Sequence, residues 1–219
     1  EYLGLLSSPY VEGDRVYVVT SRCEVLCLDL HGQANGNQGP FMDEGQYMAG
    51  PGKPKVEILP TDADIIWKYD MMDELGVFPH NASNCSVIIE GDTVFVCTSN
   101  GQDWTHVNIP SPNSPSFIAL DQQTGQFLGE DDAKIGPRIF HGQWTSPSMG
   151  VVNGKKQVYF GGGDGYCYGY SGTDTVDKDG VKVLKEEFRY DCNPEEYRVK
   201  NGKTLKYATF DGPSEVIAT

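Results

Sequence analysis

The sequence of 219 residues lacks several features that would place it in common functional classes. No apolar run approaches the roughly 20 residues of a membrane-spanning helix, and no basic patch offsets an excess of 31 acidic over 17 basic residues. The formal charge of -14 disfavours binding to nucleic-acid phosphates and to anionic membranes. Six cysteines are present, but neither C-x-x-C nor C-x-x-C-H occurs, so zinc ribbons and covalently attached haem have no support.

The composition and the start of the chain bear on its location. No signal peptide is recognisable and the sequence begins at Glu1 without a methionine, so we expect any targeting segment to have been removed or to lie outside this sequence. The 26 glycines and 13 prolines are typical of a turn-rich all-β protein. These features predict an extracytoplasmic, for example periplasmic, domain with no membrane span.

A β-hairpin signal occurs three times along the chain. Two runs rich in β-branched and aromatic residues flank a glycine-containing turn at residues 12–14, 90–92 and 153–155. Each hairpin is followed by two further extended runs. One such sheet cannot bury both of its faces alone, so we expect the copies to pack face to face. The third and fourth runs of the three copies lie at residues 25–29 and 64–69, 116–121 and 126–130, and 164–170 and 183–190.

The second copy contains Ala119-Leu120-Asp121-Gln122-Gln123-Thr124-Gly125, and the fourth run of the first contains Ile66-Trp67-Lys68. Here the chain resembles the pyrroloquinoline-quinone-type β-propeller repeat, in the core motif A-x-D-x-x-T-G and in the outer-strand tryptophan. The resemblance assigns structural roles to Ala119, Asp121, Thr124, Gly125 and Trp67. It implies a propeller in which Trp67 is buried against the neighbouring blade. The third copy has only a degenerate Tyr170-Ser171-Gly172, and Gly129 stands where the second copy would carry its tryptophan.

The predicted fold is therefore all-β, with almost no helix: an incomplete β-propeller of about three four-stranded antiparallel blades plus one further strand. Blade 1 is expected at about residues 7–70, blade 2 at 84–131 and blade 3 at 145–191, with the first strand of a fourth blade at 214–219. A closed propeller needs at least about four blades. We expect the remaining blades to come from the same chain or from another subunit.

Long insertions indicate where function would lie. Residues 31–62 interrupt blade 1 and residues 100–115 interrupt blade 2, while residues 172–180 are expected to form a polar turn. In an up-and-down meander, residues 71–83, 100–115 and 131–145 all fall on one face, and the hairpin turns and residues 31–62 fall on the other. The candidate ligand- or partner-binding residues on the first face are His80, Asn81, Asp103, Trp104, His106, His141, Gln143 and Trp144.

Two interpretations of the histidines stay open. They converge at a pore mouth, where they could bind a metal or another ligand, or each imidazole caps a loop carbonyl. The sequence alone assigns no metal site. Cys85 and Cys97 are equidistant from Gly91 and would then face each other across the hairpin, either as two small buried residues or as a possible disulfide.

Two classes of function remain. The first is a noncatalytic propeller scaffold that presents its loops to a protein, peptide or glycan partner. The second, implied by the resemblance, is a segment of a quinoprotein dehydrogenase, in which pyrroloquinoline quinone and calcium occupy the propeller axis, or of a larger redox assembly. Those enzymes place adjacent cysteines against the cofactor, and this sequence has no Cys-Cys pair. Three blades cannot enclose a cofactor, so we expect none in this segment by itself and favour the scaffold.

Overall fold

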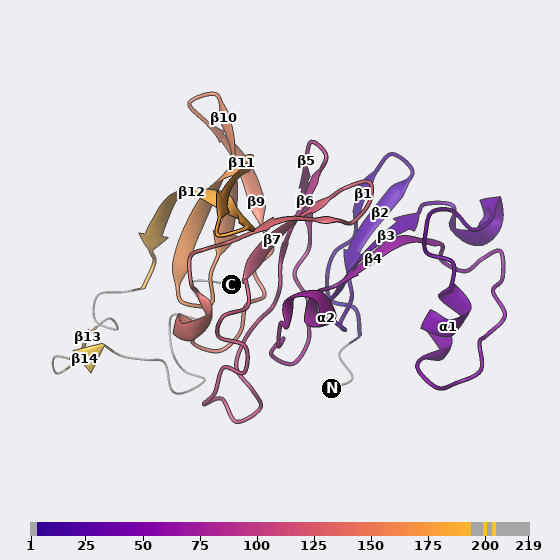
Figure 1. Ribbon diagram of the computed structural model, residues 1–219, viewed down its shortest axis with the longest axis horizontal. Helices are drawn as coiled ribbons and strands as arrows, with labels where there is room; N and C mark the ends of the chain where they lie inside the picture. The colour runs from indigo at the N-terminus through magenta and orange to yellow at the C-terminus, as the bar shows by residue number, and fades with distance from the viewer. Residues whose placement is uncertain (1–3, 194–198, 201–202, 205–219) are drawn as a thin grey trace.

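A computed structural model describes residues 4–193, 199–200 and 203–204, which form an almost entirely β architecture (Figure 1). The strand expected at 214–219 lies outside the described residues. The first sheet is an antiparallel meander with strand order β1-β2-β3-β4. Its strands are β1 (Tyr10–Glu12), β2 (Arg15–Val19), β3 (Glu24–Asp29) and β4 (Ile65–Asp70).

The second sheet joins two more meanders edge to edge, in the order β5-β6-β7-β8-β12-β11-β10-β9. The two meet through a parallel contact between β8 and β12 at the pair Val183 and Glu130. Three meanders arranged in this way confirm the predicted fold class, a partial β-propeller. The strands are β5 (Ile88–Glu90), β6 (Thr93–Cys97), β7 (Phe117–Asp121), β8 (Phe127–Glu130), β9 (Ser148–Val152), β10 (Lys155–Gly161), β11 (Tyr166–Lys178) and β12 (Val181–Asp191). A short hairpin, β13 (Val199–Lys200) and β14 (Lys203–Thr204), follows.

The hairpin turns contain two residues, one fewer than the sequence pattern indicated. Glu90 pairs directly with Thr93, so the centre of that hairpin lies between Gly91 and Asp92. This moves the register by one residue, and Cys85 lies before β5 rather than opposite Cys97. Two-residue turns are favoured because their backbone twist matches the twist of the strands they connect.

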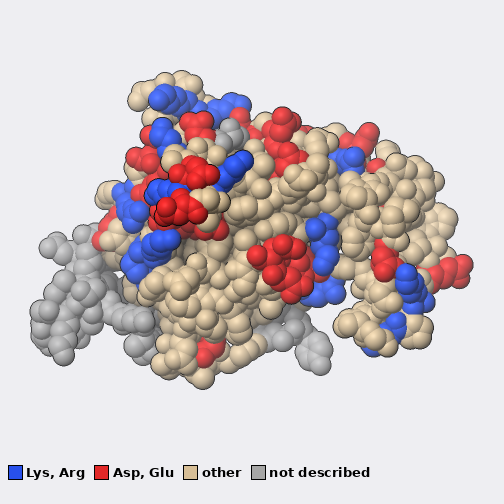
Figure 2. All heavy atoms as spheres, in the orientation of Figure 1, with Lys and Arg blue, Asp and Glu red and all other residues tan. Residues whose placement is uncertain are grey.

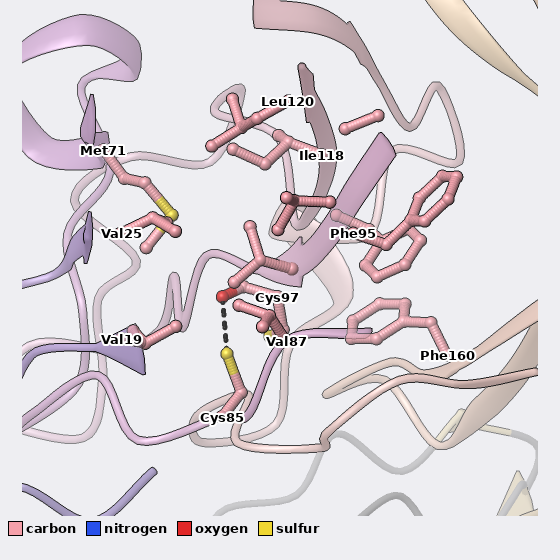
Figure 3. Close-up of a cluster of buried hydrophobic side chains, with 14 of the residues drawn as sticks. Val19, Val25, Met71, Cys85, Val87, Phe95, Cys97, Ile118, Leu120 and Phe160 are labelled. Atoms are coloured by element: carbon pink, nitrogen blue, oxygen red, sulfur yellow. Dashed lines mark hydrogen bonds between the residues drawn. The ribbon is translucent and has the colours of Figure 1, made fainter. Parts of the chain in front are cut away.

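The disulfide considered for Cys85 and Cys97 is not present. Both residues are buried free thiols, and Cys85 Sγ donates a hydrogen bond to the carbonyl oxygen of Cys97 at 2.9 Å (Figure 3). Burial raises the pKa of Cys97 well above its ordinary value, because the thiolate would be desolvated. Cys85 and Cys97 are therefore two small buried residues, which is the first of the two alternatives.

The third blade departs from the sequence prediction between residues 172 and 180. Strand β11 continues to Lys178, where a polar turn was expected, and the chain reverses at Asp179 and Gly180 instead. Both turn residues have positive φ angles, 53° and 85°, which a type I′ turn requires. At the degenerate motif, residues 170–172, the pairing of β11 with β12 shifts register after Tyr170, and β11 continues without ending.

The insertion at residues 31–62 is attached to the first sheet by buried carboxylates. It contains a short 3-10 helix, η1 (Gly32–Asn35), and helix α1 (Glu44–Ala49). Glu44, 2% exposed, accepts hydrogen bonds from Ile65 N and Asn37 Nδ2. The segment thus packs against strand β4, with α1 beside the first sheet in Figure 1.

One apolar core extends through all three blades. Val19, Val25 and Met71 come from the first blade, and they continue into residues of the second and into Phe160 of the third (Figure 3). Phe117 stacks on Phe160, with ring centroids 4.9 Å apart. Because the blades share this core, removing one blade would expose apolar surface on the next.

Trp67 of β4 joins the first blade to the second. Its side chain is 3% exposed, so it is buried as expected, and its Nε1 donates to the carbonyl oxygen of Gln122 at 3.0 Å. Asp121 Oδ1 accepts from Thr124 N and Oγ1 at 2.8 and 2.7 Å, which closes the turn beneath the indole. Gly125 has φ +72°, and a Cβ there would lie 2.6 Å from the ring. The repeat motif therefore builds the surface on which Trp67 packs, while Ala119 lies in the core behind it.

The contact between the second and third blades is made differently. Gly129 pairs with Ala119 on β7, and a Cβ at Gly129 would lie 3.2 Å from both the carbonyl oxygen of Lys182 and a side-chain atom of Thr175. The missing side chain lets β8 and β12 approach closely enough to pair. Backbone proximity replaces the tryptophan at this interface.

We expect Trp67→Ala to lower the free energy of unfolding by about 3–5 kcal/mol, because it removes a buried aromatic side chain and its hydrogen bond. Chemical denaturation of the purified protein measures this. Trp104→Ala is the matched control: that side chain is 59% exposed, and its loss should change stability by less than about 0.5 kcal/mol. Equal stability losses in the two variants would contradict the assigned packing.

Candidate functional site

Three loops meet at the end of the sheets opposite the β1–β2, β5–β6 and β9–β10 turns (Figure 1). We call them loop A (residues 76–87), loop B (98–116) and loop C (131–147). Gly101 N donates to the carbonyl of Phe78 at 2.9 Å, and Gln102 N donates to the carbonyl of His141 at 2.8 Å. Loop B therefore contacts both of the others, and the three loops share one face, as the up-and-down topology predicted.

Local structure fixes the direction of loop A. It follows helix α2 (Met71–Leu75), whose N-cap Asp70 accepts from the backbone amides of Met72 and Asp73 and which ends at left-handed Gly76. Asn100, fully buried, then ties loop A to loop B, since its Oδ1 accepts from Phe78 N at 3.1 Å and its Nδ2 donates to the carbonyl of Ser111 at 2.8 Å.

One histidine from each loop contributes to a cluster of imidazole rings. His80, His106 and His141 have ring centroids 4.1 to 4.9 Å apart. One ring nitrogen from each lies within 4.8 Å of the others. His80 and His141 are 1% and 5% exposed, whereas His106 is accessible to solvent. The cluster therefore has a buried base and an open side.

The backbone around the cluster holds His80 in one orientation. Its Nδ1 is 2.7 Å from the carbonyl oxygen of Gln102, so Nδ1 carries the proton and donates it. In the neutral ring the lone pair is then on Nε2. Gly101 makes the close approach possible, because a Cβ there would lie 2.8 Å from His80 Cβ and 2.9 Å from the carbonyl oxygen of His141.

Two tryptophans border the imidazoles. Trp144 lies 5.8 Å from His80 and 5.5 Å from His141 between ring centroids, and its Nε1 donates to the carbonyl of Ala82 at 3.2 Å. Trp104 lies 6.5 Å from His80 and is 59% exposed. One ring is fixed against loop A and the other projects into solvent.

The turn that presents Trp104 and His106 is held by Asp103. Its Oδ1 accepts from Thr105 N at 3.0 Å and Thr105 Oγ1 at 2.5 Å, and its Oδ2 accepts from Asn108 Nδ2 at 3.0 Å. The hydrogen bonds from the Thr105 and Asn108 side chains lower the pKa of Asp103 to about 2. The carboxylate thus acts on the site by ordering this turn.

The remaining residues named from the sequence have different positions. Gln143 is 1% exposed: its Nε2 donates to the carbonyl of Asn100 and to Ser116 Oγ, and its Oε1 accepts from Gly163 N. It connects loops B and C to the third blade beneath the rings. Asn81 is exposed next to His80, with a left-handed φ of 63°.

A network not found from the sequence anchors loop C to β11. Arg138 Nε and Nη2 donate to Asp164 Oδ2 at 3.0 and 2.8 Å, and the Tyr168 hydroxyl donates to the same oxygen at 2.7 Å. Burial raises the pKa of Tyr168, which stays a hydrogen-bond donor. No local spacing signals this contact, because Arg138 and Asp164 are far apart in sequence.

Comparison with solved structures identifies the fold. A quinohemoprotein alcohol dehydrogenase from Pseudomonas putida HK5 matches 91% of this chain with a TM-score of 0.50 and 19% sequence identity. The chain has the quinoprotein-type β-propeller fold. It spans 22% of the length of that dehydrogenase. The β-propeller expected from the sequence is therefore also the fold of the structure. At 19% identity the similarity shows the fold alone.

Two further structures align at lower TM-scores. BamB from Moraxella catarrhalis matches 85% of this chain and 42% of its own, at 15% identity and a TM-score of 0.38. Quinohemoprotein alcohol dehydrogenase from Comamonas testosteroni matches 86% and 35%, at 12% identity and 0.34. No protein-family model matches the sequence, and no curated protein matches it. Among the described residues, no helix is both long and apolar enough to cross a membrane.

We expect Asp103→Asn to loosen the turn at residues 103–108, because the neutral amide accepts weaker hydrogen bonds than the carboxylate. In the wild type the folded pKa of about 2 lies below the unfolded value of about 3.9. The ordering is therefore complete above about pH 4 and is lost as the pH falls through about 2. The amide resonance of Thr105, followed by NMR against pH, measures this. The control is Asp179→Asn in the β11–β12 turn, and an unchanged Thr105 titration in Asp103→Asn would contradict the role of Asp103.

Proposed function

We propose that this chain is a noncatalytic binding module: a β-propeller segment whose loop face captures a polypeptide partner. The observation that supports this best is the presentation of Trp104. Its indole is 59% exposed and Val107 beside it is 70% exposed, on a turn that Asp103 holds in place. An exposed aromatic ring on an ordered turn provides contact area while little conformational entropy is lost on binding.

The surroundings of this turn favour a polypeptide over a charged polymer. The loops that extend below the sheets in Figure 1 are covered mostly by uncharged side chains in Figure 2. Val107 offers only aliphatic contact, which suits an apolar side chain of a peptide better than a sugar hydroxyl. The overall charge of -14 would steer a basic partner toward the molecule.

We also propose a second contact surface, on the third blade, which is the last of the described blades. On one face of the third blade, β9 exposes Val152 at 43%, and β12 exposes Tyr190 at 68% and Phe188 at 40%. Propeller blades bury such side chains against the next blade. We propose that the remaining blades, from this polypeptide or from another, cover this surface.

The alternative function is a segment of a pyrroloquinoline-quinone-dependent dehydrogenase or of a larger redox assembly. The fold of the Pseudomonas putida enzyme supports it. The donor set of the loop face supports the binding module, since calcium takes oxygen ligands and this cluster offers imidazole nitrogens. The three imidazoles do not match the oxygen ligands of calcium, and we propose no quinone cofactor for this segment by itself.

The extracytoplasmic, for example periplasmic, location is likewise a proposal. It is supported by the turn-rich composition with its acidic excess. Cys23, Cys27, Cys85 and Cys97 are buried, so these thiols are shielded from oxidants in such a compartment.

The proposal predicts that peptides selected from a random phage library on the wild-type protein bind through Trp104. Trp104→Ala should weaken them at least about thirtyfold, the effect of losing a hot-spot contact of about 2 kcal/mol. Isothermal titration with synthetic peptides measures the affinities. Met42→Ala, a similarly exposed apolar residue in the insertion at residues 31–62, is the matched control and should bind as the wild type does.

Three outcomes would contradict the binding module. Peptides indifferent to Trp104 would exclude this face as the binding surface, and selective binding on a glycan array instead of to peptides would reassign the partner. The third is stoichiometric binding of pyrroloquinoline quinone with calcium, accompanied by alcohol- or sugar-dependent dye reduction. Loss of that binding in a His80→Ala, His141→Ala double variant would establish the dehydrogenase alternative.

A further inference from the structure

We propose that His80, His106 and His141 form a binding site for one divalent transition-metal ion, for which zinc is the best fit. The inference rests on the proposed function, because the ion would lie in the same loop face. The notable feature is that three loops, separated in sequence, each deliver one imidazole to the same point. Imidazole nitrogen favours zinc, copper, iron and nickel, whereas magnesium and calcium prefer oxygen.

The distances are suitable for closure around an ion. One nitrogen from each ring lies within 4.8 Å of the others. Zinc bound to nitrogen at about 2.0–2.1 Å in a tetrahedral site separates its ligands by about 3.3 Å. The rings must therefore approach by about 1.5 Å at most. His106 lies on the solvent side and can supply part of this movement, and small rotations of the His80 and His141 rings in the buried base would supply the rest.

The orientation of His80 matches that of a metal ligand. A histidine that binds a metal through one nitrogen usually donates its other N–H to a carbonyl or carboxylate, which fixes the tautomer. His80 Nδ1 makes this bond to the carbonyl oxygen of Gln102 at 2.7 Å. The contact also satisfies the interpretation of the histidines as caps for loop carbonyls. The two roles are compatible when the ion binds His80 through Nε2.

The site would be ordered before the ion arrives. Gly101 N donates to the carbonyl of Phe78 and Gln102 N donates to that of His141, so loops A, B and C are already connected beneath the rings. Gln143 connects the same layer to the third blade. Such support limits the entropy lost when the ion binds.

Three protein ligands leave a tetrahedral ion with one open position. Zinc sites with three protein ligands hold water or a bound group in the fourth. Here that position would face the solvent side, near His106 and the exposed Trp104. A carbonyl or carboxylate of the bound polypeptide would therefore complete the coordination, and the indole would contact the adjacent side chain.

The test is isothermal titration of zinc chloride into metal-free protein that carries no affinity tag. We expect one ion per chain, and visible absorption from a four-coordinate cobalt(II) derivative. His106→Ala and His141→Ala should each weaken zinc binding more than about a hundredfold, beyond the loss seen when a supporting residue is removed. His31→Ala is the matched control: His31 is exposed and pairs with Asp14 on the opposite face, so its loss should leave zinc binding unchanged.

His106 is the decisive position, because its solvent-exposed ring can be removed without opening the core. Zinc binding that survives in His106→Ala, or that is lost equally in His31→Ala, would overturn the metal site. Trp104→Ala separates this proposal from the binding module, since it should lose the peptide and keep the ion. Peptide binding by a wild-type protein that takes up no zinc would overturn the metal site alone. Zinc binding without any Trp104-dependent peptide would overturn the binding module alone.

Discussion

The contact of one indole ring with one turn sets the positions of the elements that carry the site. Trp67, in the middle of β4, packs against the turn at residues 121–125, and its Nε1 donates to the carbonyl oxygen of Gln122. The chain continues from β4 through α2 into loop A, which carries His80, while loop B runs directly into β7 before that turn. Packing Trp67 on the turn therefore fixes loop A relative to loop B. The convergence of the imidazoles is a consequence of how the first two blades pack.

The loop face combines a rigid base with exposed side chains. Asn100 and Gln143 are buried and use their amides to join the loops, and Arg138 holds loop C to Asp164. Above them Trp104 projects into solvent. Polar groups that are buried and satisfied favour one arrangement over alternatives. Gln143 is a candidate binding residue from the sequence. In the structure it supports the site by holding loops B and C in place.

The sequence could predict the fold because its signals are local. Gly91 and Gly154 mark hairpins, residues 119–125 carry the repeat motif, and Trp67 lies at the outer-strand position. It could also place the histidines on one face, since strand direction alone determines which loops share an end. It could not predict that β11 continues past Gly172, because a register shift compensates for the degenerate motif. Nor could it predict the bond between Arg138 and Asp164, which depends on tertiary packing.

The central claim is that the three loops form a site ordered for a ligand, with the imidazole cluster at its centre. Crystals soaked in zinc chloride and measured on both sides of the zinc absorption edge test this most directly. The account predicts one strong anomalous peak between His80, His106 and His141, with Nδ1 of His80 still bonded to the carbonyl of Gln102. The account would be contradicted if no anomalous density appeared between the three imidazole rings and zinc were found only at surface carboxylates.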